Sequence, residues 1–202
     1  TIEKIFALEN YRDQLAAFSQ TIWVSEDILL DLADSQTPQG IVAVVQKEEV
    51  GQADFSQGKF LFLEDVQDPG NVGTIIRTAD AAGFTGVIVS EKSADIYSLK
   101  TLRSMQGSHF HLPIYRMSSQ ALLKEIKEAV IPVLATTLSK DSVDYRELPP
   151  IENFVLVMGN EGQGISSLMA ESADQLVHIS MKGQAESLNV AVAAGILIFH
   201  LS

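Results

Sequence analysis

Apolar runs alternate with amphipathic stretches along most of the chain, and this alternation predicts its secondary structure. From residue 59 onward, strands are expected at 60–63, 87–89, 109–114, 131–135, 154–158 and 176–179. Helices are expected at 71–82, 96–102 and 119–129, from residue 165, and at 187–200. Such alternation predicts an α/β fold, with a mainly parallel sheet covered by helices on both faces.

The front of the chain has a pattern of its own. Strands are expected at 4–8, 21–24 and 41–45, and helices at 11–19 and 25–32. Because the chain opens almost directly on a strand, this unit is expected to be truncated at its start. The predicted division is a small α/β domain at residues 1–50, a polar linker at 51–58 and the main domain at 59–202.

Composition narrows the class of protein. A chain of 202 residues with 46% hydrophobic residues can form one good core and a smaller appendage. Its most apolar stretch, residues 190–201, is too short to cross a bilayer, so we expect a cytoplasmic protein with no membrane partner. The absence of cysteine excludes disulfides and thiolate zinc sites, and the four scattered histidines predict no metal site.

The net charge of -12, from 14 basic and 26 acidic residues, disfavours non-specific attraction to phosphate. A local basic pocket can still bind a polyanion on an otherwise acidic protein. Net charge therefore does not exclude an RNA partner.

The first polar, glycine-rich segment, residues 65–80, follows a predicted strand and enters a predicted helix. Residues 68–70 predict a sharp turn, and Gly73 permits close backbone approach. Asn71 and Arg77 share no single helical stripe, so both face one site only if the loop curls over the helix start. The alternative is a capped helix with a solvated arginine. The segment matches neither the dinucleotide nor the phosphate-loop pattern.

The second segment, residues 154–166, is a buried strand that runs into a loop with three glycines. Gly159 and Gly164 have the spacing of a phosphate loop. Ile-Ser at 165–166 replaces the lysine and hydroxyl that hold phosphate and magnesium, which excludes a nucleoside triphosphatase. The glycines leave backbone groups open to a ligand around Glu161. A tight turn with an exposed glutamate is the alternative.

The third segment, residues 179–194, places Ser187 and Asn189 where an apolar helix is expected to begin. Ser187 as a helix N-cap is one interpretation, because serine satisfies free backbone donors there. Asn189 is less easily explained, since asparagine is a mediocre helix former and needs hydrogen-bond partners if it is buried.

Together the three segments resemble, in order and spacing, the three motifs of the SpoU (TrmH-like) ribose methyltransferases of the SPOUT superfamily. The similarity covers residues 59–200, through Asp68-Pro-Gly-Asn-Val-Gly with Arg77, Gly159-Asn-Glu-Gly-Gln-Gly-Ile and Ser187-Leu-Asn-Val-Ala. Residues 1–50 are similar to the small RNA-binding domain that many members carry in front.

The resemblance implies transfer of a methyl group from S-adenosylmethionine to a ribose 2′-hydroxyl in rRNA or tRNA. The front domain favours rRNA. It also implies a C-terminal trefoil knot and a homodimer. Backbone groups of Gly159, Ile179 and Leu188 are expected to hold the adenosine, with Thr136 or Thr137 nearby.

The resemblance assigns the chemistry to Arg77, with Asn71, Glu161, Ser187 and Asn189 organising the arginine and the ribose. Because guanidinium stays protonated in proteins, we expect Arg77 to clamp a phosphate and stabilise developing alkoxide rather than act as a base. The acceptor of the hydroxyl proton is left open. The main alternative is a catalytically silent RNA-binding protein with the same fold; a nucleotide-dependent oxidoreductase is disfavoured by the missing dinucleotide pattern.

Overall fold

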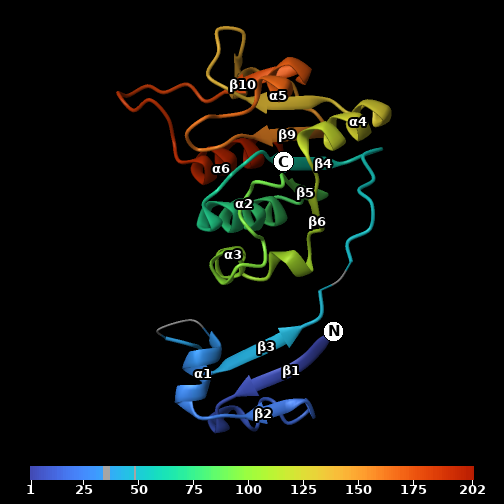
Figure 1. Cartoon of the computed structure of the whole chain (residues 1–202). Helices are drawn as coiled ribbons and strands as arrows, with labels where there is room; N and C mark the ends of the chain where they lie inside the picture. Colours follow the sequence, from blue (N-terminus) through green and yellow to red (C-terminus); the bar gives the residue numbers. More distant parts are fainter. Residues whose placement is uncertain (34–36, 48) are drawn as a thin grey trace. The chain divides into compact units, whose positions relative to one another are not determined.

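The computed structural model describes residues 1–33, 37–47 and 49–202 (Figure 1). The chain divides into two compact units, Thr1–Glu49 and Val50–Ser202. Each unit has its own β-sheet. Residues 34–36 and 48 belong to the predicted domain 1–50 but lie outside the described residues.

The small unit is a three-stranded sheet in the order β2-β1-β3 with one helix. Strand β1 pairs in parallel with β2 and antiparallel with β3. Ile5 on β1 and Leu29 on the helix are among its buried side chains. The elements are β1 (Ile2–Ala7), β2 (Thr21–Trp23), α1 (Glu26–Ala33) and β3 (Ile41–Val45).

The helix predicted at residues 11–19 is wrong. The structure has only a short 3-10 helix, η1 (Glu9–Tyr11), followed by turns. Most side chains from 11 to 20 are exposed, so a helix there has no apolar face to bury. Short helices without such packing are marginal in water.

The large unit contains a seven-stranded sheet in the order β6-β5-β4-β9-β7-β10-β8. Every neighbouring pair is parallel, as predicted from the uninterrupted apolar strands. The strands are β4 (Lys59–Leu63), β5 (Gly86–Val89), β6 (Ile114–Arg116), β7 (Val133–Thr136), β8 (Val143–Asp144), β9 (Phe154–Met158) and β10 (Gln175–His178).

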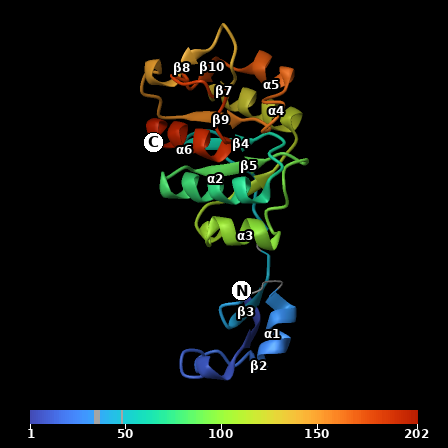
Figure 2. The same cartoon turned by 90° about the vertical axis from the view of Figure 1, so that its left-hand side faces the viewer.

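Helices cover both faces of this sheet, which confirms the predicted layers (Figure 2). On β4, Leu61 and Leu63 pack into the cluster that contains residues of α2 and α6, while Phe60 and Phe62 pack into the cluster with α4 and α5. Among the described residues, no helix has both the length and the apolar character that crossing a membrane requires. The helices are α2 (Pro69–Ala81), α3 (Leu99–Met105), α4 (Ser119–Ala129), α5 (Ser167–Ser172) and α6 (Val190–Leu201).

The strand predicted at 109–114 is mostly wrong. Gln106 and Gly107, with φ of 51° and 88°, take the left-handed conformation that ends α3. The chain then forms a 3-10 helix, η2 (Ser108–Phe110), and pairs with β5 only from Ile114 onward.

The start of α2 is set by a cap and a close contact. Asp68 is the N-cap, and its Oδ1 accepts a hydrogen bond of 2.9 Å from the Asn71 N–H, so Asn71 lies within the first turn. A Cβ on Gly73 would lie 2.6 Å from both the Ser104 Cβ and the Thr101 carbonyl oxygen of α3. The predicted close approach at Gly73 is therefore confirmed, and it seats α2 against α3.

Val130 ends α4 in the left-handed conformation, with φ of 55° and 85% of its surface exposed. This conformation costs a residue with a Cβ about 1–2 kcal/mol. We predict that Val130→Gly raises the free energy of unfolding by about 1 kcal/mol in urea titrations, because little packing is lost. Val130→Ala, which keeps the Cβ, should gain much less; equal effects of the two changes would contradict this explanation.

Candidate functional site

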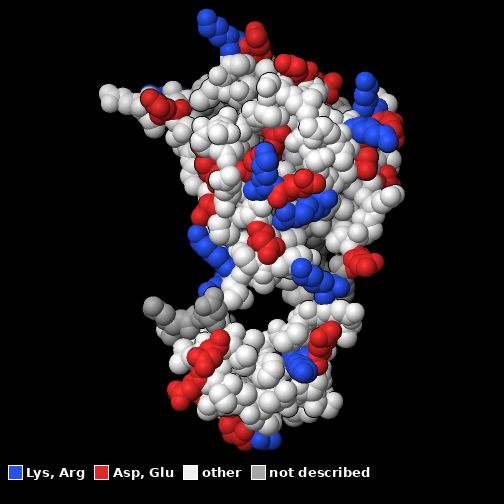
Figure 3. Space-filling view, viewed as in Figure 1, with Lys and Arg blue, Asp and Glu red and all other residues white. Residues whose placement is uncertain are grey.

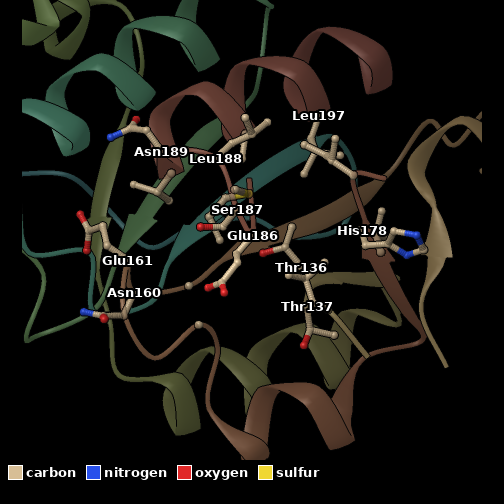
Figure 4. A pocket seen from close by; sticks show the side chains of 18 of the residues that line it. Thr136, Thr137, Asn160, Glu161, His178, Glu186, Ser187, Leu188, Asn189 and Leu197 are labelled. Carbon is tan, nitrogen blue, oxygen red and sulfur yellow. The ribbon is translucent and has the colours of Figure 1, made fainter. Parts of the chain in front are cut away.

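A cavity of about 670 Å³ opens beyond the carboxyl ends of β7, β9 and β10. Loops that follow these strands and the start of α6 form its walls (Figure 4). Ligands of parallel sheets bind at this edge, so the cavity is the candidate site. The sequence-predicted residues that line it are Thr136, Thr137, Gly159, Glu161, Ile179, Ser187, Leu188 and Asn189.

The loop after β9 folds back on itself. Asn160 and Gly164 exchange two backbone hydrogen bonds of 2.9 Å. A Cβ on Gly159 would lie 2.2 Å from the Gly164 carbonyl carbon, closer than a side chain can approach. Glycine at 159 is therefore a steric requirement of the loop and brings bare backbone to the cavity wall.

A chain of side-chain hydrogen bonds joins the three predicted segments. The Asn189 Nδ2 donates to the Asn71 Oδ1 at 3.1 Å, and the Asn71 Nδ2 donates to the Glu161 Oε1 at 3.1 Å. Asn71 does not line the cavity itself but is hydrogen-bonded to two residues that do. The first segment, residues 65–80, therefore contacts the second and third segments through Asn71.

Glu161 is held by donors at the start of α2. Partial burial raises the pKa of its carboxyl group, but the Asn71 amide and the N–H groups of Gln67 and Asp68 outweigh that effect. Its pKa therefore lies below the ordinary value, and the group is ionised at neutral pH.

Asn189, and not Ser187, is the N-cap of α6. Its Oδ1 accepts hydrogen bonds from the N–H groups of Ala191 and Val192, at 2.9 and 3.3 Å. The helix predicted at 187–200 therefore begins only at Val190, and the interpretation of Ser187 as a cap is wrong. Ser187 is left exposed on the cavity wall.

Arg77 is not part of this cluster. Its side chain is exposed on α2, does not line the cavity and makes no hydrogen bond or ion pair with any residue that the structure describes. The structure thus contains the capped helix and solvated arginine of the alternative interpretation. An exposed guanidinium remains available to a ligand that approaches from solvent.

Several cavity residues were missed by the sequence analysis. The Asn160 Nδ2 donates to the Asp65 carbonyl at 2.8 Å, and its Oδ1 accepts from Gly162 N–H at 2.8 Å, which braces the loop. An asparagine before a glycine-rich turn is the sequence signal for such a brace. Figure 4 shows Glu186 reaching into the cavity and His178 at its wall, and no local pattern predicts either orientation.

The charge of the cavity limits its ligand. Glu161 and Glu186 line it, whereas lysine and arginine are absent from its described lining. Such a wall favours a cationic ligand over a phosphate. Over the parts of the chain that can be described, no group of three or more His, Cys, Asp or Glu side chains is placed to hold a metal ion.

Comparison with known proteins adds independent information. A family model described as the SpoU rRNA Methylase family matches residues 58–199. The 23S rRNA (guanosine(2553)-2′-O)-methyltransferase RlmP of Bacillus subtilis is 44% identical over 182 residues, which are 90% of this chain and 72% of that protein. A putative TrmH family tRNA/rRNA methyltransferase of the same organism, YacO, is 34% identical, over 81% of this chain and 69% of its own.

Solved structures agree with these sequence matches. An AdoMet-bound rRNA methyltransferase from Sinorhizobium meliloti superposes with a TM-score of 0.90 at 34% identity, over 99% of this chain and 79% of that one. The SpoU methyltransferase AviRb from Streptomyces viridochromogenes gives a TM-score of 0.85 at 29% identity, over 100% and 81%.

The contact between Asn71 and Glu161 generates a prediction. Asn71→Ala removes a donor that lowers the Glu161 pKa, so the pKa should rise toward the ordinary glutamate value. A carboxyl ¹³C NMR titration measures this midpoint. Thr74→Ala, on the exposed surface of α2, should leave it unchanged; an unmoved Glu161 midpoint in Asn71→Ala would show that this contact is absent in solution.

Proposed function

The chain belongs to the SpoU rRNA methylase family, and we propose that it transfers a methyl group from S-adenosylmethionine to a ribose 2′-hydroxyl of ribosomal RNA. The observation that carries this proposal is the hydrogen-bonded chain from Asn189 through Asn71 to Glu161 beside the cavity. A protein that only binds RNA does not require these three polar side chains to converge beside a cavity.

The cavity fits the cofactor in size and charge. Its volume of about 670 Å³ lies in the range of small-molecule sites. Its carboxylates, Glu161 and Glu186, complement a cation. When bound, S-adenosylmethionine supplies a methyl group on a positively charged sulfonium, with a neutral thioether as the leaving group.

The adenosine is assigned to backbone groups of Gly159, Ile179 and Leu188 on the cavity wall. Thr136 and Thr137 lie nearby, but they are not equivalent. The Thr136 hydroxyl donates its proton to the Val157 carbonyl at 2.9 Å and can only accept from a ligand, whereas the Thr137 hydroxyl is assigned as the donor.

The acceptor ribose is assigned to the outer side of the cluster. Ser187 and Asn189 present polar atoms there, and Glu161 orients the Asn71 amide. Arg77, exposed on α2, is assigned to the RNA phosphate next to the target nucleotide. Its guanidinium forms bidentate hydrogen bonds with phosphate and stays protonated, which suits a clamp rather than a base.

A trefoil knot in the C-terminal half is proposed from the match to the SpoU family over residues 58–199. A homodimer is supported by α6, which leaves Val192 and Phe199 52% and 58% exposed. Such apolar side chains on an apolar helix suit a protein interface.

The small unit, Thr1–Glu49, is proposed to bind RNA. Figure 3 shows lysine and arginine side chains interspersed with acidic ones on the face in view, without one large basic field. Scattered lysine and arginine side chains of this kind can each contact a phosphate without forming a single basic patch.

We predict that Arg77→Ala lowers methyl transfer to an rRNA transcript by about 10²-fold or more, the usual cost of losing a transition-state stabiliser. The dissociation constant for S-adenosylmethionine should stay within about twofold of wild type, because Arg77 does not line the cavity. Tritiated-methyl incorporation and calorimetry measure the two quantities. Lys124→Ala on α4 serves as the charge-matched control. Retained turnover in Arg77→Ala would remove Arg77 from the mechanism.

Asn189 has two contacts that substitution can separate. Asn189→Asp keeps the oxygen that caps α6 but loses the amide that donates to Asn71. We predict a nearly unchanged melting temperature and at least a tenfold loss of methyl transfer. A tenfold loss corresponds to the free energy of about one hydrogen bond. Asn189→Ala should also lose about 1 kcal/mol of stability with the cap. Full activity in Asn189→Asp would show that Asn189 acts only as a cap.

A further inference from the structure

Glu64, directly after β4, is a buried carboxylate without a cationic partner. It is 5% exposed, and no described lysine, arginine or histidine forms an ion pair with it. A buried carboxylate depends on hydrogen-bond donors because it has lost its water. The residues that donate hydrogen bonds to Glu64 are therefore tightly coupled to it.

Its donors come from two helix starts. One carboxylate oxygen accepts from the Ser166 N–H at 2.7 Å. The other accepts from the Ser166 hydroxyl at 2.8 Å and the Ser119 hydroxyl at 2.7 Å. Ser119 begins α4, whereas Ser166 is the N-cap of α5 and directly follows the loop that borders the cavity.

The glycine loop, residues 159–166, is thereby anchored near both ends to residues 64–65. Near its start, the Asn160 side chain donates to the Asp65 carbonyl oxygen at 2.8 Å. At its far end, Ser166 is held by Glu64. The cavity-lining residues 160–164 lie between these anchors, and Glu64 itself does not line the cavity.

We propose that Glu64 is a positioning residue for S-adenosylmethionine binding, acting through Ser166 on the glycine loop. Glycines 159, 162 and 164 give this loop more conformational freedom than other residues would. A loop released at its far end must be ordered when the cofactor binds, and that cost appears as weaker affinity. The inference rests on the proposed use of this cofactor.

Two serine variants test it as a matched pair. Ser166→Ala and Ser119→Ala each remove one hydroxyl donor to the same Glu64 oxygen, but only Ser166 continues the loop. Since Ser166 also caps α5, Ser118→Ala, which removes the cap of α4, controls for the loss of a cap. Calorimetry on the full chain measures the dissociation constant for S-adenosylmethionine.

Ser166→Ala should weaken cofactor binding about tenfold, as expected for one charge-assisted hydrogen bond. Ser119→Ala and Ser118→Ala should change it less than about twofold, even if they lower the melting temperature equally. Glu64→Gln, which keeps the shape but not the charge, should fall between wild type and Ser166→Ala. With saturating cofactor, kcat of Ser166→Ala should stay near that of wild type, because the weaker binding raises only the KM for the cofactor.

Hydrogen exchange gives a readout independent of turnover. Backbone amides of residues 160–165 should exchange faster in cofactor-free Ser166→Ala than in Ser119→Ala. Equal weakening of cofactor binding by the two serine variants, or none by either, would overturn the role of Glu64. A wild-type chain that binds no S-adenosylmethionine would instead overturn the proposed function.

Discussion

The parallel pairing of β4 with β9 is the constraint on which the site depends. The two strands run in register from Lys59 opposite Phe154 to Leu63 opposite Met158, and both are buried within the sheet. The segments that follow them therefore leave the same sheet edge side by side. Gln67 and Glu161, 94 positions apart in sequence, meet there. The apolar strands thus bring together polar residues that have no local reason to meet.

The site is built largely from residues that also complete the fold. Asn189 caps α6 while it binds Asn71, and Asp68 caps α2 while its N–H donates to Glu161. A cap has restricted geometry, because its side chain must reach specific backbone N–H groups. The polar cluster is consequently placed by the same contacts that begin its helices.

Charge is divided between the inside and the outside of the site. The cavity presents Glu161 and Glu186, which suit a cationic cofactor, while Arg77 lies outside on α2. An acidic protein with a net charge of -12 can therefore act on a polyanion. Negative charge on the cavity wall suits a positively charged ligand, and the exposed guanidinium is available to phosphate.

Local sequence determined the elements whose packing is simple. The spans of β9 and α4 follow from an uninterrupted apolar run and an amphipathic pattern, and the loop segments around Asn71, Glu161 and Asn189 follow from their glycines and polar residues. Periodicity predicted a helix at 11–19, but most side chains there are exposed and no α-helix forms. It also predicted a strand at 109–114, but a left-handed turn at 106–107 precedes a short 3-10 helix there.

Tertiary structure decided which polar atoms meet. Strand register and the start of each helix decide that Asn189 rather than Ser187 caps α6. They also decide that Asn71 joins Asn189 to Glu161, and that Glu64 binds Ser166. Propensity and periodicity describe neighbours in sequence. These hydrogen bonds join residues brought together by burial of the sheet, and only the complete packing determines their partners.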